Sequence, residues 1–445
     1  MGARDFTRWT LGYGLPGAML RRAARSGDLI ARTAVDPQLR ADPFAAYDEL
    51  RARGPLVTGR LATATVSHPV ANEILRSDRF GVLAGSSLPS LVERLYAASL
   101  DPRALGPVDP PSLLAVDPPD HTRYRRLVSR VFTARAVAAL EPRIAEVAES
   151  LLDDLDGSFD LVQHYAGQLP VAVIAEILGV PQAMRAQLLE WGNHAAVTLD
   201  PDLRWRPFRQ AVAALRAFHD WLDGHIAGLR RSPGDDLLSQ LANVEDGPER
   251  LTDVELRTTA LLLLGAGFET TVNLIGNAVV QLAAHPDQLA SLLDAPDGWA
   301  NAVEEVLRYD SPVQVTVRLC KQDTVLAGHH IAVGGFIVIP LGGANRDPDV
   351  FADPHRFDVT RANAHDHLAF SSGIHYCLGA SLARLEAAIG LRLLFERLPD
   401  LSIAGTPVRR ATRVLRGYES IPVVTSRRTR TIAAKVTDQN PTTSG

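Results

Sequence analysis

The sequence predicts a mainly α-helical protein built as one large unit with a small β-rich part. Three observations lead to this prediction. Helical periodicity of apolar residues dominates the chain, strand-like segments are few and occur late, and no Gly/Ser-rich or Pro-rich linker or internal repeat divides it. Length alone, 445 residues, would allow about three domains of ~150 residues each. Because no linker separates such domains, we assign residues 36–425 to a single domain.

The individual elements follow from local periodicity. Apolar residues at helical spacing predict helices over residues 135–155, 169–178, 212–229, 253–284, 300–308 and 378–398. Runs of β-branched and apolar residues predict strands over 313–319, 331–340 and near 421–424.

The two ends of the chain differ in character from the predicted domain. Residues 1–35 form an extension with six arginines against two aspartates and enough apolar residues for one helix face. We expect it to pack on the body of the protein, with contact to a membrane surface or a partner as the alternative. Residues 426–445 are polar and end in Asn-Pro-Thr-Thr-Ser-Gly, which predicts a disordered tail.

Composition excludes several classes of protein. A net charge of −5 argues against a dedicated nucleic-acid binder. Cys320 and Cys377 are the only cysteines, which excludes a disulfide framework and a multi-cysteine zinc or iron–sulfur site. The longest apolar runs, 260–268 and 331–344, are far shorter than the ~20 residues that span a bilayer. We therefore expect a cytoplasmic protein without a transmembrane anchor.

The predicted helix 253–284 is the longest in the chain and carries an unusual centre. Thr252 and Glu255 form a capping box at its start, and His285-Pro286 ends it. Two glycines flank Ala266 at its middle, each costing ~1 kcal/mol relative to alanine. Glu269 follows, and its charge needs a partner beside so apolar a run. The pattern fits either a functional site or a helix crossing that needs small residues.

The segment Phe370–Ala380 is the strongest local pattern. Cys377 directly precedes a predicted helix, where unpaired N–H groups and the helix dipole favour a thiolate over a thiol. Gly373 and Gly379 allow the backbone to come close to a bulky group on the sulfur. Cys377 is therefore a candidate metal ligand.

This segment, Phe-x-x-Gly-x-His-x-Cys-x-Gly, resembles the haem-binding loop of the bacterial cytochrome P-450 monooxygenases. Four further segments resemble other motifs of that family, and they follow in the family's order. Residues 117–125 resemble the haem-edge helix, 266–271 the oxygen-binding segment, 305–308 the Glu-x-x-Arg helix, and 351–357 the segment that supplies a third residue to that pair. The resemblance covers residues 36–424. It departs at Ser371, where many members have glycine, and at Phe268, which would narrow the space over the iron.

The resemblance implies a large helical haem-thiolate fold with a small β-rich subdomain and haem b, iron protoporphyrin IX, as cofactor. Cys377 would ligate the iron, and such a thiolate favours cleavage of the O–O bond. The other residues implied for the cofactor are His121, Arg125, Arg318 and His375 for the two propionates, and Ala266, Gly267, Phe370, Gly373 and Gly379. Spacing supports the first two, because positions i and i+4 share a helix face.

Roles for three further groups follow from the resemblance. Thr270 would bind dioxygen and guide protons, with Glu269 feeding the relay, as general acid chemistry requires. Glu305 and Arg308, an exposed pair on pattern alone, would form a buried structural network with Arg356.

Electrons and substrate would come from outside. The chain has no flavin or nicotinamide module, so electrons would come from NAD(P)H through ferredoxin reductase and ferredoxin. Arg123, Arg126 and Arg130 lie on the helix face opposite His121, and either dock this acidic donor or form a solvated face. The substrate would be a small apolar organic molecule, open to hydroxylation or epoxidation. Its candidate contacts are Leu263, Phe268, Val313, Gln314, Val315, Thr316 and Leu415.

Three other functions deserve comparison. Gly12-x-Gly14-x-x-Gly17 matches a dinucleotide fingerprint but lacks a preceding buried strand, which disfavours a dehydrogenase. His365, His367, His375 and Cys377 suggest a zinc hydrolase, which explains none of the other motifs. A haem-binding protein without turnover is the third alternative, and the Glu269-Thr270 pair argues against it.

Overall fold

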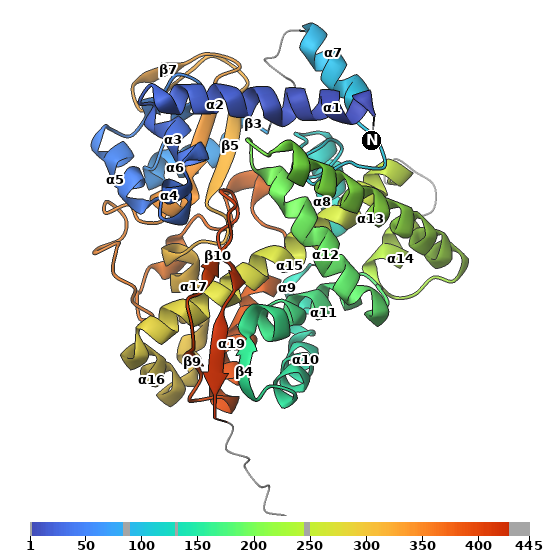
Figure 1. The fold of residues 1–445 in the computed structure, drawn as a ribbon, viewed down its shortest axis with the longest axis vertical. Coiled ribbons are helices and arrows are strands. Elements are labelled where there is room, and N and C mark those ends of the chain that lie inside the picture. The colour runs from blue at the N-terminus through green and yellow to red at the C-terminus, as the bar shows by residue number, and fades with distance from the viewer. Residues whose placement is uncertain (1, 83–89, 130–131, 244–249, 427–445) are drawn as a thin grey trace, which may run out of the picture.

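The computed structural model describes residues 2–82, 90–129, 132–243 and 250–426. Helices form most of the body, and short strands gather mainly on one side of it (Figure 1). The helices of the first half are α1 (Ala3–Trp9), α2 (Leu15–Arg25), α3 (Leu29–Val35), α4 (Pro37–Ala41), α5 (Phe44–Ala52), α6 (His68–Arg76), α7 (Ser90–Ser99), α8 (Asp120–Ser129), α9 (Ala134–Ala138), α10 (Glu141–Asp153), α11 (Gln168–Ile177) and α12 (Arg185–Ala196). Those of the second half are α13 (Trp205–Arg231), α14 (Leu237–Ala242), α15 (Asp253–Ala284), α16 (Pro286–Asp294), α17 (Trp299–Tyr309), α18 (Leu341–Ala344) and α19 (Ala380–Arg397).

The predicted mainly α fold is confirmed, although several predicted helices have other bounds, above all the one expected over 212–229, which is α13 and begins seven residues earlier, at Trp205. The segment 135–155 is divided into α9 and α10, because Pro142 lacks an N–H and starts a new helix. The helix expected from residue 378 begins at Ala380, since Gly379 caps it. Helix α15 has the predicted bounds and the predicted capping box between Thr252 and Glu255.

The strands form small sheets that pair distant parts of the chain. They are β1 (Val57–Thr58), β2 (Thr63–Ala64), β3 (Phe80–Gly81), β4 (Gly157–Asp160), β5 (Val315–Cys320), β6 (Thr324–Leu326), β7 (His329–Ile331), β8 (Phe336–Pro340), β9 (Ser402–Ile403), β10 (Val408–Arg409), β11 (Tyr418–Ser420) and β12 (Pro422–Thr425). The main sheet has the order β1-β2-β8-β5-β3, in which only β2 and β8 are parallel. Its long strand β5 carries Arg318, one of the basic side chains of the candidate active site described below.

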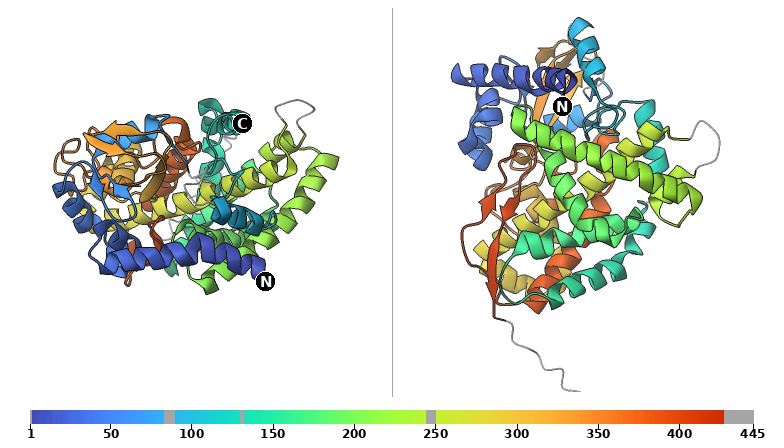
Figure 2. Two further views of the ribbon diagram at one scale, coloured as in Figure 1. Left: turned by 90° about the horizontal axis from the view of Figure 1, so that it is seen from above. Right: turned by 45° about the vertical axis from the view of Figure 1, so that its right-hand side comes forward.

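Helix α15 runs through the centre of the helical body and contacts α11, α12, α17 and α19 (Figures 1 and 2). It is long and apolar enough to cross a membrane by length and composition alone, but 78% of its most apolar window is buried inside the protein. We therefore assign it as a core helix, most of whose apolar surface packs on protein.

The N-terminal extension packs on the body. A π-helical turn, Thr10–Gly14, joins α1 and α2 into one long helix that crosses the top of the molecule (Figure 1). Its inner side is tied down by polar contacts: Trp9 donates to the carbonyl of Leu203, and the Tyr13 hydroxyl donates to the carbonyl of Thr198. The Gly-x-Gly-x-x-Gly match therefore lies within this helix and follows no strand, so the dinucleotide-site reading is wrong.

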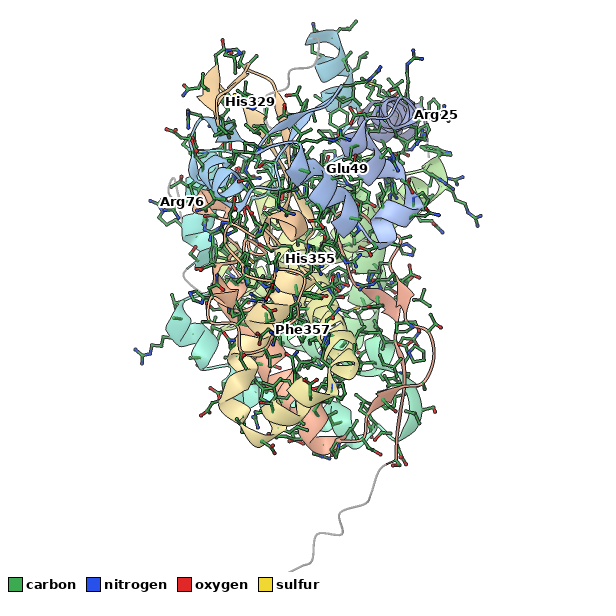
Figure 3. The ribbon with its side chains drawn as sticks, turned by 90° about the vertical axis from the view of Figure 1, so that its left-hand side faces the viewer. Arg25, Glu49, Arg76, His329, His355 and Phe357 are labelled. Carbon is green, nitrogen blue, oxygen red and sulfur yellow. The ribbon has the colours of Figure 1, made fainter. Side chains whose placement is uncertain are left out.

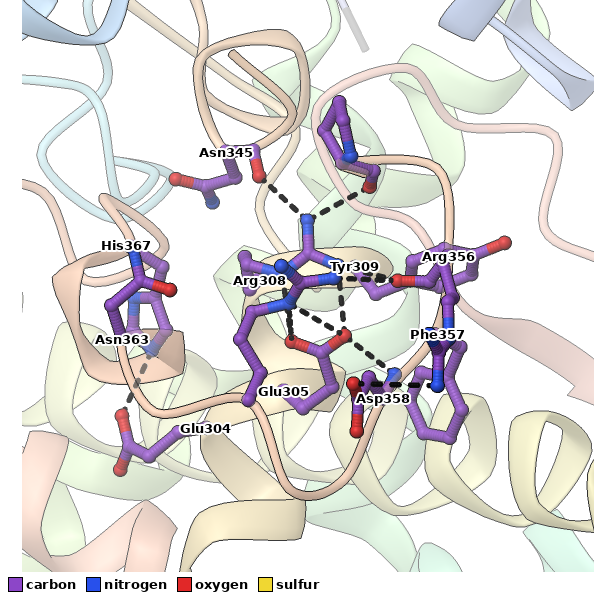
Figure 4. Close-up of polar contacts among 12 residues, drawn as sticks. Glu304, Glu305, Arg308, Tyr309, Asn345, Arg356, Phe357, Asp358, Asn363 and His367 are labelled. Atoms are coloured by element: carbon purple, nitrogen blue, oxygen red, sulfur yellow. Dashed lines mark hydrogen bonds and ion pairs between the residues drawn. The ribbon is translucent and has the colours of Figure 1, made fainter. Parts of the chain in front are cut away.

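A buried ionic network fixes the loop between α18 and α19 (Figure 4). Glu305 and Arg308 are fully buried and form a two-bond pair, with donor–acceptor distances of 2.7 and 2.8 Å. Arg308 also donates to the carbonyls of Asn345, Pro354 and Arg356.

The prediction that the Arg356 side chain is the third member of this network is wrong. The Arg356 side chain is 68% exposed and pairs with Asp358, so only its backbone carbonyl joins the network. Arg361 takes the place instead: its side chain is 8% exposed and its Nε lies 3.2 Å from a Glu305 oxygen. The two arginines are five residues apart in an irregular loop, so sequence spacing does not tell which one turns inward.

We predict that Arg361→Met lowers the free energy of unfolding by about 2–4 kcal/mol, because it removes a contact to Glu305 and leaves the carbonyls of Ala352, Asp353 and Arg356 without this donor. The matched variant Arg356→Met should change it by less than ~0.5 kcal/mol, since this side chain is exposed. Urea unfolding of the haem-loaded protein, followed by circular dichroism, measures both. Equal losses in the two variants would contradict the assignment.

Candidate active site

The loop before α19 brings Cys377 into position through a strained turn. The Cys377 amide donates to the carbonyl of Phe370 at 2.9 Å, which closes the loop. Ser371 has φ +62° and Gly373 has φ +68°, a conformation that favours glycine. Ser371, at which the resemblance leads us to expect glycine, therefore has a backbone conformation that glycine adopts more easily. A Cβ at residue 373 would collide with the carbonyl of Leu75, so Gly373 allows the loop to lie against α6.

Cys377 is a free thiol that solvent reaches, although protein atoms crowd around its sulfur. Burial raises its pKa, while the Gly379 amide and the cations Arg125 and Arg384 act in the opposite direction. The predicted thiolate is thus not favoured by the protein alone, because α19 begins three residues further on. A metal cation bound by this sulfur would supply the missing counter-charge, since coordination deprotonates a thiol.

Four basic side chains face one another beside this cysteine. The rings of His121 on α8 and His375 lie 4.3 Å apart, and the Nε2 atom of each is buried without a hydrogen-bond partner. Burial and the neighbouring cations, first Arg318, lower the pKa of His375 to about 3. Burial also lowers the pKa of Arg318 to about 10 and that of Arg125 below its usual value.

This basic cluster (His121, Arg125, Arg318, His375) is short of negative charge. Asp117 is the acidic neighbour, with one oxygen 3.9 Å from His375 Nε2. Its single carboxylate faces two guanidiniums, of which Arg318 is buried and Arg125 half-buried, and burial lowers the pKa of both. A ligand with two carboxylates would relieve the repulsion and use the unpaired ring nitrogens. The cluster and the nearby thiol therefore fit the propionates and iron of haem.

The centre of α15 opens onto space, although the helix lies in the core. Ala266 is exposed, and a Cβ on Gly265 would meet no atom within 4 Å. A Cβ on Gly267, by contrast, would lie 2.9 Å from Ile174 of α11. Both interpretations of the glycine-rich centre, a helix crossing and a functional site, therefore apply. Gly267 permits the close crossing with α11, and Ala266 borders the candidate active site. A Cβ on Gly379 would also meet open space.

The polar residues that follow this opening have defined partners. Thr270 Oγ1 donates to the carbonyl of Ala266 at 2.9 Å, as the spacing predicts. Glu269 is 3% exposed, and its Oε1 lies 2.8 Å from Nη1 of Arg410. Burial raises the pKa of Glu269, and Arg410 opposes this. Arg410 also donates to Asn193 of α12.

Sequence reasoning missed Arg410. It follows β10, 141 positions after Glu269, and nothing in its local sequence distinguishes it from the arginines at positions 409 and 413. Only the fold of the β10–β11 hairpin against α15 brings this guanidinium to the buried acid.

The predicted substrate contacts separate into two groups. The prediction that Phe268 contacts the substrate is wrong. Its side chain is fully buried and its ring packs on Gly192 of α12, so it points away from the opening at Ala266. Gln314 and Val315 are also turned inward, because Gln314 donates to the carbonyl of Ser311 and Val315 joins a core with Tyr47. The remaining contacts stay open to assignment: Leu263 one turn before Ala266, Thr316 bonded to Arg318, and Val313 bridged to Leu415.

The predicted docking arginines are only partly available. Arg123 pairs with Glu255 and stacks on Tyr124 at 4.6 Å. Arg126 also has interactions within the structure, and Arg130 lies outside the described residues. Among the described residues, no group of three His, Cys, Asp or Glu side chains is arranged to hold a metal. The zinc-hydrolase alternative therefore has no ligand cluster there.

Comparisons with known proteins agree with this geometry. The family described as "Cytochrome P450" matches residues 300–401. A cytochrome P450 140 of Mycobacterium tuberculosis is 48% identical over 427 residues, 94% of this chain and 97% of that one. The cytochrome P450 monooxygenase PikC of Streptomyces venezuelae is 39% identical, over 86% of this chain and 91% of its own.

Solved structures show the same fold. Ligand-free CYP164A2 of Mycobacterium smegmatis superposes with a TM-score of 0.80 and 36% identity, covering 89% of this chain and 99% of that one. P450BioI in complex with an acyl carrier protein carrying hexadec-9Z-enoic acid has a TM-score of 0.79 and 34% identity, over 87% of this chain. The relatives match most of the chain, and the fold, the cysteine loop and the basic cluster agree with them. The chain therefore belongs to the cytochrome P450 family of haem-binding monooxygenases.

Proposed function

We propose that this protein inserts one atom of dioxygen into a small apolar organic substrate and reduces the other to water. The overall reaction consumes one dioxygen, two electrons and two protons for each hydroxylated product and water. The observation that carries the proposal is the basic cluster beside Cys377, which needs a dianionic ligand. Haem bound there supplies the activation of dioxygen, through iron held by the Cys377 sulfur.

Protons reach the reaction through α15 in this proposal. The Thr270 hydroxyl lies beside the opening at Ala266, where it can pass a proton inward. Glu269 is buried with a raised pKa, so it holds its proton at higher pH than an exposed glutamate does. Arg410 and Asn193 connect this acid to α12, and they orient its carboxylate. A haem-binding protein without turnover has no use for such an acid–hydroxyl pair.

Electrons come from NAD(P)H through ferredoxin reductase and ferredoxin in this proposal. A hollow beside the cysteine loop is lined by Arg76, Ile374 and Tyr376 among others, and the last two are exposed. Arg76 points outward from α6 (Figure 3). Because His121 on α8 contacts His375 on the loop, α8 borders this region, and Arg76 is the arginine that lines the hollow itself. An acidic ferredoxin matches that charge.

The substrate class rests on the lining and on relatives. Leu263, Val313 and Leu415 offer an apolar wall. Two relatives are named for hydroxylation: 6-deoxyerythronolide B hydroxylase, 42% identical over 68% of this chain, and vitamin D(3) 25-hydroxylase, 44% identical over 68%. We therefore favour hydroxylation over epoxidation, in the cytoplasm.

The thiolate assignment predicts a spectrum. The reduced protein with carbon monoxide should show the red-shifted Soret band of thiolate-ligated haem, and Cys377→Ser should abolish that band. Cys320→Ser is the matched control and should keep it, because this buried thiol lies in the small sheet core. A histidine-type spectrum in the wild type would overturn both the ligand and the proposed reaction.

The relay predicts that Thr270→Ala releases peroxide at the expense of product, lowering product formed per electron pair by about 100-fold, the lower end of the range for a lost acid–base group. Thr271→Ala is the control: Thr271 makes the same type of bond, to the carbonyl of Gly267, but is buried. Peroxide and product assays with a surrogate ferredoxin system measure the ratio. Equal uncoupling in both variants would contradict a specific role for Thr270.

The raised pKa of Glu269 predicts a pH dependence. Product per electron pair should be highest below this pKa and fall as pH rises through it, because the acid loses its proton. Arg410→Met removes the cation that lowers this pKa, so the fall should move to higher pH. Glu269→Gln should remove the dependence. Coupling measured across about pH 5 to 9 tests this, and an unmoved profile in Arg410→Met would refute the pairing.

A further inference from the structure

The outer side of the long N-terminal helix is both apolar and basic. Phe6, Leu15 and Met19 are 54%, 52% and 54% exposed, whereas Asp5, Arg8, Tyr13, Gly17 and Ala23 on the opposite side are buried. Three exposed apolar side chains on one helix leave apolar area in water that the body of the protein does not cover.

Every exposed charge on this helix is positive. Within residues 2–27 the acidic residue Asp5 is buried and bonded to Arg216, and the exposed charged side chains are Arg4, Arg21, Arg22 and Arg25. Arg21, Arg22 and Arg25 make no ion pair with a described acidic residue. Arg25 lies at the outer rim of the molecule, at the end of α2 (Figure 3). The face therefore attracts anions although the whole chain is acidic.

Two neighbouring features extend this face. Helix α7, which packs on α1, exposes Leu91 and Leu95 (65% and 49%) with Arg94 between them. At the other end, a shallow cleft between α2 and α3 is lined by Arg21, Arg25 and Arg32, with Asp36 4.0 Å from Arg32. Guanidinium groups gathered around a cleft suit a phosphate, which each can bind through two hydrogen bonds.

We propose that this N-terminal face (Phe6, Leu15, Met19, Arg21, Arg22, Arg25, Leu91 and Leu95) docks the protein on an anionic phospholipid bilayer. Its helix lies flat along the surface of the protein, with aromatic and aliphatic side chains set between arginines. This is the arrangement of helices that lie in the bilayer interface, where apolar side chains enter the headgroup region and arginines meet phosphate. An acidic protein would satisfy the charges but leaves no reason for the exposed Leu15 and Met19 side chains on the same helix.

The proposed contact with the bilayer is peripheral, and the helix that makes it is fixed to the body of the protein. The inner side of the helix is fixed to the body by Arg8, whose guanidinium is paired with Asp109, and by Trp9 and Tyr13. Docking through the outer side therefore needs no unfolding of the extension. The proposal is independent of the proposed reaction, since it concerns a surface and not the haem site.

Flotation of the haem-loaded full-length protein with lipid vesicles tests the proposal. The wild type should bind vesicles that contain phosphatidylglycerol and not vesicles of phosphatidylcholine alone. Raising the ionic strength to about 1 M should release it, because the Debye length falls to ~3 Å. Absence of binding to both vesicle types, or equal binding to both, would overturn the proposal without affecting the monooxygenase assignment, which the carbon monoxide spectrum reports.

Paired variants locate the surface. R21Q/R25Q should weaken binding at least about tenfold, while R135Q/R231Q, with the same net charge and exposed arginines elsewhere, should not. L15S/M19S should also weaken it, whereas V408S/V424S, at exposed positions in the C-terminal strands, should not. If a variant pair and its control pair weakened vesicle binding equally, the N-terminal face would not be the docking surface. The same conclusion would follow if the wild type associated with itself instead of binding the vesicles. An unchanged thermal midpoint and Soret band show that each variant is folded.

Discussion

A buried charge needs an opposite charge, and this requirement organises the protein from its scaffold to its site. The basic cluster places His121, Arg125, Arg318 and His375 together inside the protein with one carboxylate, Asp117, at their edge. Such an arrangement is unfavourable on its own, and lowered pKa values report the cost. It becomes favourable when a ligand brings two carboxylates, so the fold is complementary to haem.

The same requirement is met within the chain in two other places. Glu305 and Arg308 neutralise each other in the core, with Arg361 closing the network, and the backbone carbonyls they bind hold the loop that leads to the cysteine. On α15, Glu269 is compensated by Arg410 from a distant hairpin. In the first network both oxygens of Glu305 have donors. The second has a single ion pair and a raised acid pKa, which suits a group that exchanges protons.

Much of the fold was predictable because it depends on short-range patterns. The capping box of α15, its stop at His285-Pro286 and its apolar periphery are local, and they predicted the bounds of the longest helix. The cysteine loop is similarly local, since Gly373 and the residues around it determine its turn. The motifs that resemble the family predicted the identity of the cofactor for the same reason: each is a continuous segment.

Sequence alone determined the helical class and the family, and it singled out the cysteine that we propose as the iron ligand. Tertiary structure decided which way side chains turn where spacing is ambiguous or where no regular element sets their direction. It turned Arg361 inward and Arg356 outward, set Phe268 against Gly192 instead of the haem space, and brought Arg410 to Glu269. It also left Phe6, Leu15 and Met19 exposed on a helix whose other side is fixed to the body. The physical reason is common to all: burial and charge pairing depend on neighbours that are distant in sequence, and only packing selects them.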